Sequence, residues 1–234
     1  MESILGSLSN AVSLIFHLNP ELLGIILLSL EVSGVALVIS TVIGLPAGAV
    51  LGLKRFPARD LTISAVNTFM GLPPVVVGLF LYLLLSRRGP LGFLGLLYSP
   101  GAMIIAQTIL AIPIVSGLCH SALVSVDPII RQAARTLGAT PTQETLAVIR
   151  EARYGILSAL LAAFGRVMAE VGAILIVGGN IAGYTRVMTT TIALETDKGN
   201  FELALALGII LLAISFIVNA ALHAVQRKGT AAGL

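Results

Sequence analysis

The chain contains long runs without a charged side chain, and this feature limits its possible folds more than any other. One such run extends from Val32 to Leu53. As a helix it is long enough to cross a hydrocarbon core of about 30 Å. In lipid, backbone amides and carbonyls must find partners within the protein, which leaves helices and closed β-barrels. The alternating apolar and polar pattern of a barrel strand is missing, so the sequence predicts a helical membrane protein.

Apolar residues dominate the rest of the chain as well. Of the 234 residues, 57% are hydrophobic and 11% are charged, and the mean hydropathy is +1.02. The predicted transmembrane helices are residues 32–53, 61–86, 101–123, 156–178 and 203–225. We therefore expect an all-α integral membrane domain over 31–226, with an amphipathic lead-in at 1–30 and a short tail at 227–234.

Prolines interrupt two of these predicted spans. Pro73 and Pro74 lie in the second span and Pro113 lies in the third. Each proline removes a helical hydrogen bond, so we expect these helices to kink or unwind locally near mid-membrane. Two interpretations stay open, namely irregular packing and a pathway lined by the freed carbonyls.

Basic residues set the expected orientation. With an external amino terminus, the cytoplasmic segments hold Lys54, Arg55, Arg59, Arg131, Arg135, Arg150, Arg153, Arg227 and Lys228, and the external segments hold only Arg87, Arg88, Arg186 and Lys198. Cytoplasmic loops of membrane proteins are enriched in Lys and Arg. We expect a multi-pass protein of the cytoplasmic (inner) membrane, with its amino terminus outside and its carboxyl terminus in the cytoplasm. Topology accounts for the net charge of +3, and no nucleic-acid partner is expected.

The polar segment DPIIRQAARTLGATPTQETLAVIREAR, residues 127–153, carries clear helix boundaries. Asp127 before a proline is a helix start, and Gly138 suits a left-handed helix end. Thr140 and Gln143 then form a capping box that starts a second helix. Two short helices joined by a glycine turn favour docking to a partner over crossing a membrane. A loop that merely connects two spans is the alternative.

The stretch QAARTLGA within this segment resembles the EAA loop of bacterial ATP-binding-cassette (ABC) importer permeases. The family pattern is Glu-Ala-Ala, three residues, Gly, nine residues and then Ile-x-Leu-Pro. The first half matches at residues 132–134 and Gly138, with Gln in place of Glu. The second half departs, because Arg150 and Glu151 occupy the positions of Leu-Pro.

This resemblance implies the type I ABC importer permease fold and a homodimeric permease. It also implies two copies of a cytoplasmic ATPase, which bind the loop, and an extracytoplasmic solute-binding protein. The implied coupling residues are Arg131, Gln132, Ala133, Ala134 and Gly138. No Gly-x-x-x-x-Gly-Lys-Ser/Thr pattern occurs, so we expect ATP and Mg on the partner subunit and no cofactor in this chain.

The external segment VGGNIAGYTRVMTTTIALETDKGNF, residues 177–201, resembles the corresponding loop of tungstate permeases, which are relatives of molybdate permeases. The resemblance implies an oxyanion importer, with tungstate first and molybdate or another oxyanion as the alternative. Thr189, Thr190 and Thr191 offer hydroxyl donors at a possible helix start, and Arg186 adds a positive charge. These threonines fit anion contact and a capped turn about equally well.

Arg166 and Glu170 are four residues apart inside the fourth predicted span. Either charge alone is costly in a membrane, so we expect the two to neutralise each other. The pair either fixes helix packing or places Arg166 on the anion path.

Other functions fit the sequence less well. An ion-coupled carrier is the first rival, but the spans show no internal repeat. A channel or a structural membrane subunit is the second, and neither requires a capped helix pair. We expect no catalytic residues and no metal site, since no nucleophile with its base and no ligand cluster is evident. Cys119 is expected to be a packing residue.

Overall fold

Three long apolar helices form the frame of the molecule. The computed structural model describes residue 13 and residues 20–232. Helices α2 (Pro20–Leu53), α5 (Pro100–Val124) and α11 (Phe201–Ala232) each contain a stretch long and apolar enough to cross a membrane. The described part of the chain is otherwise helical or irregular, without strands, which confirms the expected all-α class.

Two further spans are bent rather than straight. Helices α3 (Arg59–Met70) and α4 (Pro74–Leu85) meet at 94°, and α8 (Arg153–Met168) and α9 (Gly172–Gly178) meet at 56°. Counting each bent pair as one crossing gives up to five spans, in the regions that the sequence predicts.

The first of these bends confirms the expectation of a proline break. Pro73 is extended at φ −65° and ψ 118°, and Pro74 begins α4. A proline at the first helical position needs no amide partner, so the chain can restart there. In contrast, α5 runs through Pro113 as one continuous helix, so of the expected kink or unwinding the helix does not unwind there.

The first long helix begins earlier than predicted. Because α2 starts at Pro20, residues 20–30 belong to this helix and not to a separate lead-in. The helix then continues through Pro46 to Leu53, and Glu31 is exposed on the helix surface. At the other end α11 continues to Ala232, through most of the predicted tail. The remaining predicted lead-in, residues 1–12 and 14–19, and the last two residues lie outside the described part.

Glycines bring α2 and α5 into close contact. A Cβ atom on Gly48 would lie 2.6 Å from the Ser116 carbonyl oxygen, and Cβ atoms on Gly44 and Gly52 would each lie 3.0 Å from a side chain of α5. Small residues at four-residue spacing allow two helix backbones to approach closely in a membrane protein. The α2–α5 pair is therefore the packed centre of the molecule, and α3, α8 and α9 pack directly against α5, whereas α11 packs against α8.

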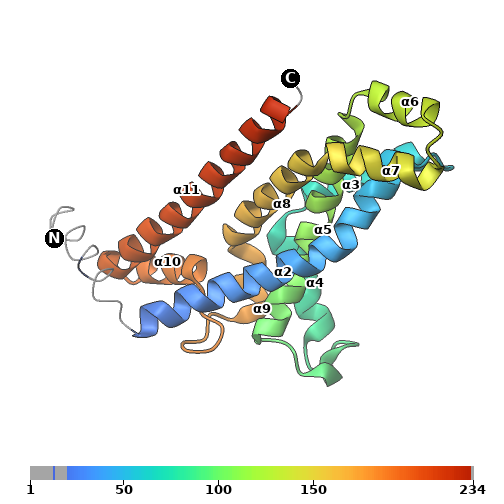
Figure 1. Ribbon diagram of the computed structural model, residues 1–234. Coiled ribbons are helices and arrows are strands. Elements are labelled where there is room, and N and C mark those ends of the chain that lie inside the picture. The colour runs from blue at the N-terminus through green and yellow to red at the C-terminus, as the bar shows by residue number, and fades with distance from the viewer. Residues whose placement is uncertain (1–12, 14–19, 233–234) are drawn as a thin grey trace.

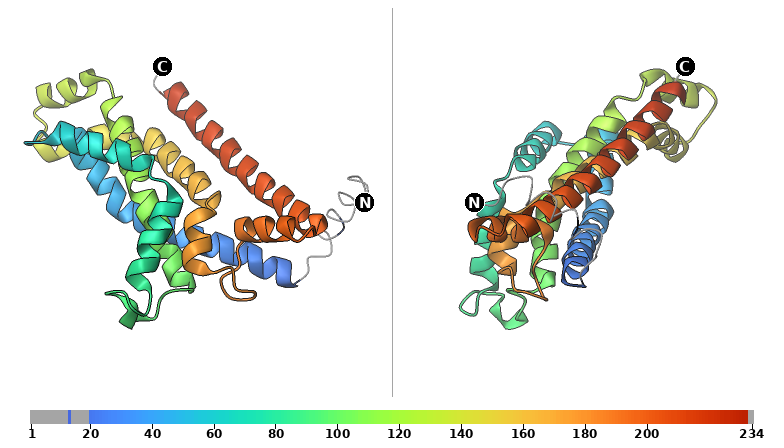
Figure 2. Two further views of the ribbon diagram at one scale, coloured as in Figure 1. Left: turned by 180° about the vertical axis from the view of Figure 1, so that it is seen from behind. Right: turned by 90° about the vertical axis from the view of Figure 1, so that its left-hand side faces the viewer.

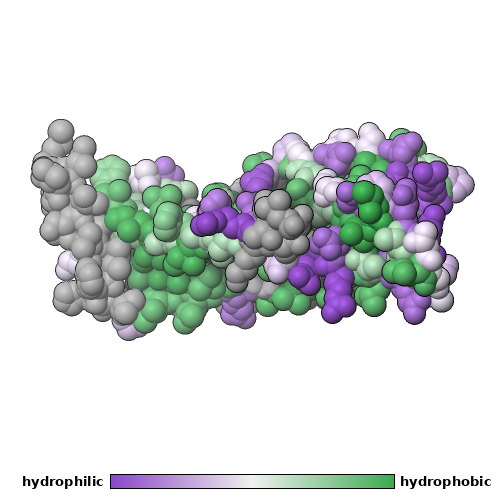
Figure 3. Space-filling model, turned by 45° about the horizontal axis from the view of Figure 1, so that its top comes forward, coloured by the Kyte–Doolittle hydropathy of each residue, from purple (hydrophilic) through white to green (hydrophobic). Residues whose placement is uncertain are grey.

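The two ends of the molecule carry different surfaces. All views place α6 (Pro128–Thr136), α7 (Pro141–Glu151) and the carboxyl-terminal end of α11 at one end (Figures 1 and 2). The short helix η1 (Gly92–Leu94) lies towards the other end, and α10 (Met188–Asp197) crosses close to the start of α11. In Figure 3 hydrophilic surface gathers at the end that carries α6 and α7.

Candidate functional site

The polar segment after α5 forms the predicted pair of short helices. The Asp127 carboxylate accepts the Ile129 amide at 2.8 Å and caps α6. At α7 the Gln143 side chain accepts the Thr140 amide at 2.8 Å, and the Thr140 hydroxyl accepts the Gln143 amide at 3.4 Å. Both predicted caps are confirmed, so local sequence signals define this α6–α7 hairpin.

Gly138 makes the turn between the two helices. Its φ is +79°, in the left-handed region, and its amide bonds to the Arg135 carbonyl at 3.0 Å. The next amide, of Ala139, bonds to the Ala134 carbonyl at 3.0 Å. No atom lies within 4 Å of a Cβ placed on Gly138, so backbone conformation and not space favours glycine here.

An ionic cluster, absent from the predictions, holds the hairpin together. The Glu144 carboxylate of α7 accepts two hydrogen bonds from Arg135 of α6, at 2.8 and 3.0 Å. The Arg131 Nε atom lies 3.2 Å from the same carboxylate. The hydrogen bonds from Arg135 hold the pKa of Glu144 below its usual value, with the charge of Arg131 adding to the effect.

The hairpin exposes apolar and small side chains together. Gln132 and Ala133 are exposed, whereas Ala134 and Ile130 are half-buried. Leu137 is 88% exposed, because it lies past the end of α6 in the turn. Ile129 and Leu146 are also 64% exposed. An outward-facing apolar surface beside charged residues is typical of a protein contact.

The three consecutive threonines lie inside the protein. Thr189 is 8% exposed and donates to the Glu170 carbonyl at 2.9 Å. Thr190 and Thr191 are fully buried. The Thr190 hydroxyl bonds to the Asn180 side-chain oxygen at 2.9 Å, and Thr191 donates to the Val187 carbonyl at 2.7 Å. Each of the three hydroxyls donates to a protein oxygen, which agrees with the capped-turn interpretation, so none has a free proton for an anion in this conformation.

The start of α10 is capped from two directions. The Thr190 hydroxyl accepts the Val187 amide at 3.2 Å. The hydroxyl of Ser29, in α2, accepts the Met188 amide at 2.8 Å. The first amides of a helix have no intrahelical partner, so these bonds attach α10 to the first long helix. The sequence gives no sign of this contact, because 159 positions separate the two residues.

Arg186 precedes α10 and is mostly buried. Its side chain is 17% exposed, and its Nη1 atom lies 3.9 Å from the Glu21 carboxylate at the start of α2. Its Nε atom is buried and has no hydrogen-bond partner among the described residues. Arg186 therefore joins the starts of α2 and α10, while the threonine hydroxyls donate to protein oxygens.

The predicted pair of Arg166 and Glu170 is wrong in its geometry. Helix α8 ends at Met168, so the two residues do not lie on consecutive turns of one helix. No ion pair joins them in the part of the chain described. Arg166 is exposed, whereas Glu170 is 5% exposed and its carboxylate accepts the Ala173 amide at 3.1 Å. Glu170 thus stabilises the start of α9.

Gln107 joins three helices in the same region. Its side-chain amide donates to the Val167 carbonyl of α8 at 3.1 Å and lies 3.3 Å from the Ser33 hydroxyl of α2. Gln107, Arg166 and Glu170 line one small cavity of about 20 Å³ beside the break between α3 and α4. Sequence reasoning missed Gln107, although an amide within an apolar run is a recognisable signal. Over residues 13 and 20–232, no three His, Cys, Asp or Glu side chains are grouped as metal ligands.

Comparisons with known proteins agree with this architecture. The family described as binding-protein-dependent transport system inner membrane component matches residues 44–229. The chain is 48% identical over 204 residues to the probable anion ABC transporter permease protein of Haloferax volcanii, covering 85% of this chain and 88% of that one. It is 40% identical over 228 residues to the tungstate uptake system permease protein TupB of Peptoclostridium acidaminophilum, covering 97% of this chain and 100% of that one.

A solved structure supports the same fold. A chain of the MetNI methionine ABC transporter, in an inward-facing conformation, superposes with a TM-score of 0.69 at 20% identity, covering 86% of this chain and 93% of that chain. The helices therefore have the type I ABC importer permease arrangement. This protein belongs to the family of inner-membrane components of binding-protein-dependent transport systems.

Proposed function

We propose that this chain is the membrane permease of an ATP-driven importer and that tungstate is its cargo. The observation that carries the proposal is the likeness to the tungstate uptake permease of P. acidaminophilum, which extends over the full length of that protein. The more identical permease of H. volcanii is described only as an anion transporter, which agrees with an oxyanion cargo. Molybdate is the alternative cargo, because it is also a tetrahedral dianion.

The α6–α7 hairpin is the proposed docking point for a separate ATPase subunit. Its turn exposes Leu137, and its caps and ionic cluster hold both helices in a fixed relation. Two permease copies and two ATPase copies would form the transporter, with ATP and Mg held by the ATPase. When the two ATPase copies bind ATP and close, they move the hairpin. This movement changes the positions of the helices that follow α7 relative to the rest of the permease.

The hairpin end is the proposed cytoplasmic side. Lys54, Arg55 and Arg59 lie next to Arg131 around one cavity at this end. Cytoplasmic enrichment in basic residues agrees with that assignment. The amino-terminal end of α2 then faces outwards, where an extracytoplasmic oxyanion-binding protein would deliver the anion.

The proposed anion path passes the break between α8 and α9. Arg166 is exposed there and shares a cavity with Gln107 and Glu170. An exposed guanidinium at such a break can attract an oxyanion transiently without holding it. Arg166→Gln is therefore expected to lower the uptake rate, whereas Arg88→Gln, an exposed arginine outside the break, leaves it unchanged. Equal uptake kinetics in both variants would remove Arg166 from the path.

Competition uptake tests the proposed cargo directly. Cells expressing the permease, its ATPase and its binding protein take up labelled tungstate, and unlabelled tungstate, molybdate or sulfate is added in excess. We expect tungstate to compete best and sulfate least. Uptake should stop when ATP is depleted and persist when the ion gradients are collapsed. Uptake that follows an ion gradient instead would make the chain part of a secondary transporter.

A further inference from the structure

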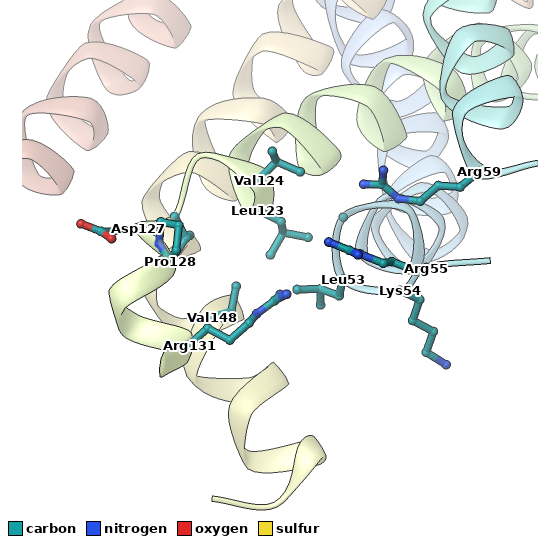
Figure 4. Close-up of a pocket in the computed structure, with 12 residues that line it drawn as sticks. Leu53, Lys54, Arg55, Arg59, Leu123, Val124, Asp127, Pro128, Arg131 and Val148 are labelled. Atoms are coloured by element: carbon teal, nitrogen blue, oxygen red, sulfur yellow. The ribbon is translucent and has the colours of Figure 1, made fainter. Parts of the chain in front are cut away.

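A cavity at the hairpin end gathers basic side chains, and the transport proposal gives this cavity no ligand. It has a volume of about 260 Å³ and lies between the ends of α2 and α5 and the start of α6. Figure 4 shows Arg55, Arg59 and Arg131 extending into the same space from three different segments. Lys54 and Asp127 also border the cavity, but their charged groups point away from it in this view. We call this site the three-arginine pocket.

The positive charge of the three-arginine pocket is only partly compensated. Arg55 is exposed and forms no ion pair within the described residues. Arg59 donates its Nε proton to the Leu51 carbonyl at 2.8 Å and lies 3.6 Å from Asp60, whose side chain is 97% exposed. Screening by water makes such an exposed partner weak. Two guanidinium groups thus keep donors available for a further acceptor.

Arg131 is compensated to a similarly small extent. It shares the Glu144 carboxylate with Arg135, and Arg135 makes the shorter, two-fold contact with that group. One negative charge therefore serves two arginines. Three guanidinium groups around one cavity repel one another, and an anion bound between them would offset this electrostatic repulsion. Planar guanidinium groups match the oxygens of a phosphate or another tetrahedral oxyanion.

The wall and the position of the pocket indicate where such an anion would come from. Leu53, Leu123 and Val124 line it beside the arginines, and these residues lie at the last turns of α2 and α5. Ends of transmembrane helices lie at the level of lipid headgroups, and basic pockets between helices on the cytoplasmic side suit anionic headgroups. The apolar wall fits the first carbons of an acyl chain, while the arginines face the phosphate.

We propose that the three-arginine pocket is a binding site for a phosphate-type tetrahedral oxyanion, supplied by the headgroup of an anionic phospholipid or by a free anion. The site lies beside α6, so its occupant contacts the base of the hairpin. It is separate from the cavity lined by Arg166, and it does not depend on which anion the protein transports.

Binding to the purified full-length chain in detergent tests the site. One arm counts bound dioleoylphosphatidylglycerol and, separately, dioleoylphosphatidylcholine by native mass spectrometry. The second arm measures radiolabelled inorganic phosphate by equilibrium dialysis without added lipid. Arg55→Gln is the main variant, because the side chain of Arg55 makes no ion pair within residues 13 and 20–232. We expect its affinity to fall about tenfold or more, the loss of one charge-assisted contact.

Two matched controls remove the same charge elsewhere. Lys54→Gln changes the neighbouring residue, whose amine points away from the pocket, and Arg88→Gln changes an exposed arginine in the loop before η1. A loss of binding in Arg55→Gln alone supports the site. The measurement that detects this loss, lipid counting or phosphate dialysis, identifies the bound anion as a lipid headgroup or a free anion. No binding in either arm, or equal losses in all three variants, overturns the proposal. Arg55→Lys should retain more affinity than Arg55→Gln, because lysine keeps the positive charge although it lacks the planar guanidinium group.

Discussion

Two polar segments interrupt this hydrophobic chain, and the structure uses them in opposite ways. In the α6–α7 hairpin the charged groups bond to each other at the surface, while Leu137 and Leu146 face outwards. Around the start of α10 the polar groups turn inwards, and Thr190 and Thr191 are fully buried. The first segment presents a surface, whereas the second supplies internal hydrogen bonds.

The contrast shows that a polar run in a membrane protein does not identify a ligand site by itself. Hydroxyl groups at a helix start suit an anion and suit the backbone of the same helix equally well. At α10 the hydroxyl groups bond to the protein backbone, because Thr189 and Thr191 donate to backbone carbonyl oxygens. The hydrogen-bond partners and the burial of the hydroxyl groups decide between anion binding and helix capping. Neither property can be read from the sequence alone.

The largest expected effect concerns the exposed surface of the hairpin. Leu137→Ser removes an 88% exposed apolar side chain, so the fold should be unchanged. If the ATPase buries this residue, its loss weakens the complex by about 1.5–3 kcal/mol, or roughly ten- to a hundredfold. Titration of the purified ATPase against the permease measures the change. Phe93→Ser, an 82% exposed residue in η1, is the control and should bind normally. Equal affinity of the Leu137 variant and wild type would contradict docking through the hairpin.

The second prediction concerns the buried threonine. Thr190→Val keeps the shape but leaves the Val187 amide and the Asn180 oxygen without their partner. A buried polar group without a partner costs about 1–3 kcal/mol, so unfolding of the purified protein should occur at lower denaturant. Thr196→Val is the matched control, because this hydroxyl is exposed in the same helix. The KM for tungstate should not change in either variant. A raised KM with full stability for Thr190→Val would restore the anion-contact interpretation.

The features that sequence predicts correctly depend on neighbours in the chain. Asp127, Thr140 and Gln143 bond to amides within three residues, so their pattern alone determines both caps. The apolar runs likewise place the spans, since lipid requires helices of a certain length. The start of α2 was missed because two isolated glutamates, Glu21 and Glu31, do not stop a helix whose other residues are apolar.

The features that sequence fails to predict depend on distant contacts or on a broken helix. The bond from Met188 to Ser29 and the Gln107 contacts exist only once the helices pack. The Arg166 and Glu170 pair fails because four-residue spacing implies contact only within a continuous helix. One available signal was the repeat of Gly44, Gly48 and Gly52, which indicates the face of α2 that meets α5.

The third prediction tests the attachment of the buried segment. Ser29→Ala removes the acceptor of the Met188 amide, so the start of α10 should lose about 0.5–2 kcal/mol of stability. Hydrogen exchange measured by mass spectrometry should become faster over residues 187–191. Ser40→Ala is the matched control, since this buried serine of α2 donates only to a carbonyl of its own helix. Unchanged exchange in the Ser29 variant would show that Thr190 alone caps α10.

The smallest expected effect concerns the ionic cluster of the hairpin. Glu144→Gln removes the charge that Arg131 and Arg135 share, so exchange in α6 should become moderately faster while the unfolding midpoint of the membrane helices stays the same. Because the hydrogen bonds from Arg135 lower the pKa of Glu144 in the folded state, the contribution is complete above the unfolded pKa of about 4.3 and is lost as pH falls through the lower folded value. The two proteins should therefore differ at pH 6 and converge only at a pH below the lowered folded pKa of Glu144. Glu151→Gln, an exposed carboxylate at the end of α7, is the control. If hydrogen exchange in α6 differed equally between Glu144→Gln and wild type at both pH values, the charge of Glu144 would have no part in joining α6 to α7. The effect of the substitution would then come from the shape of the glutamine side chain.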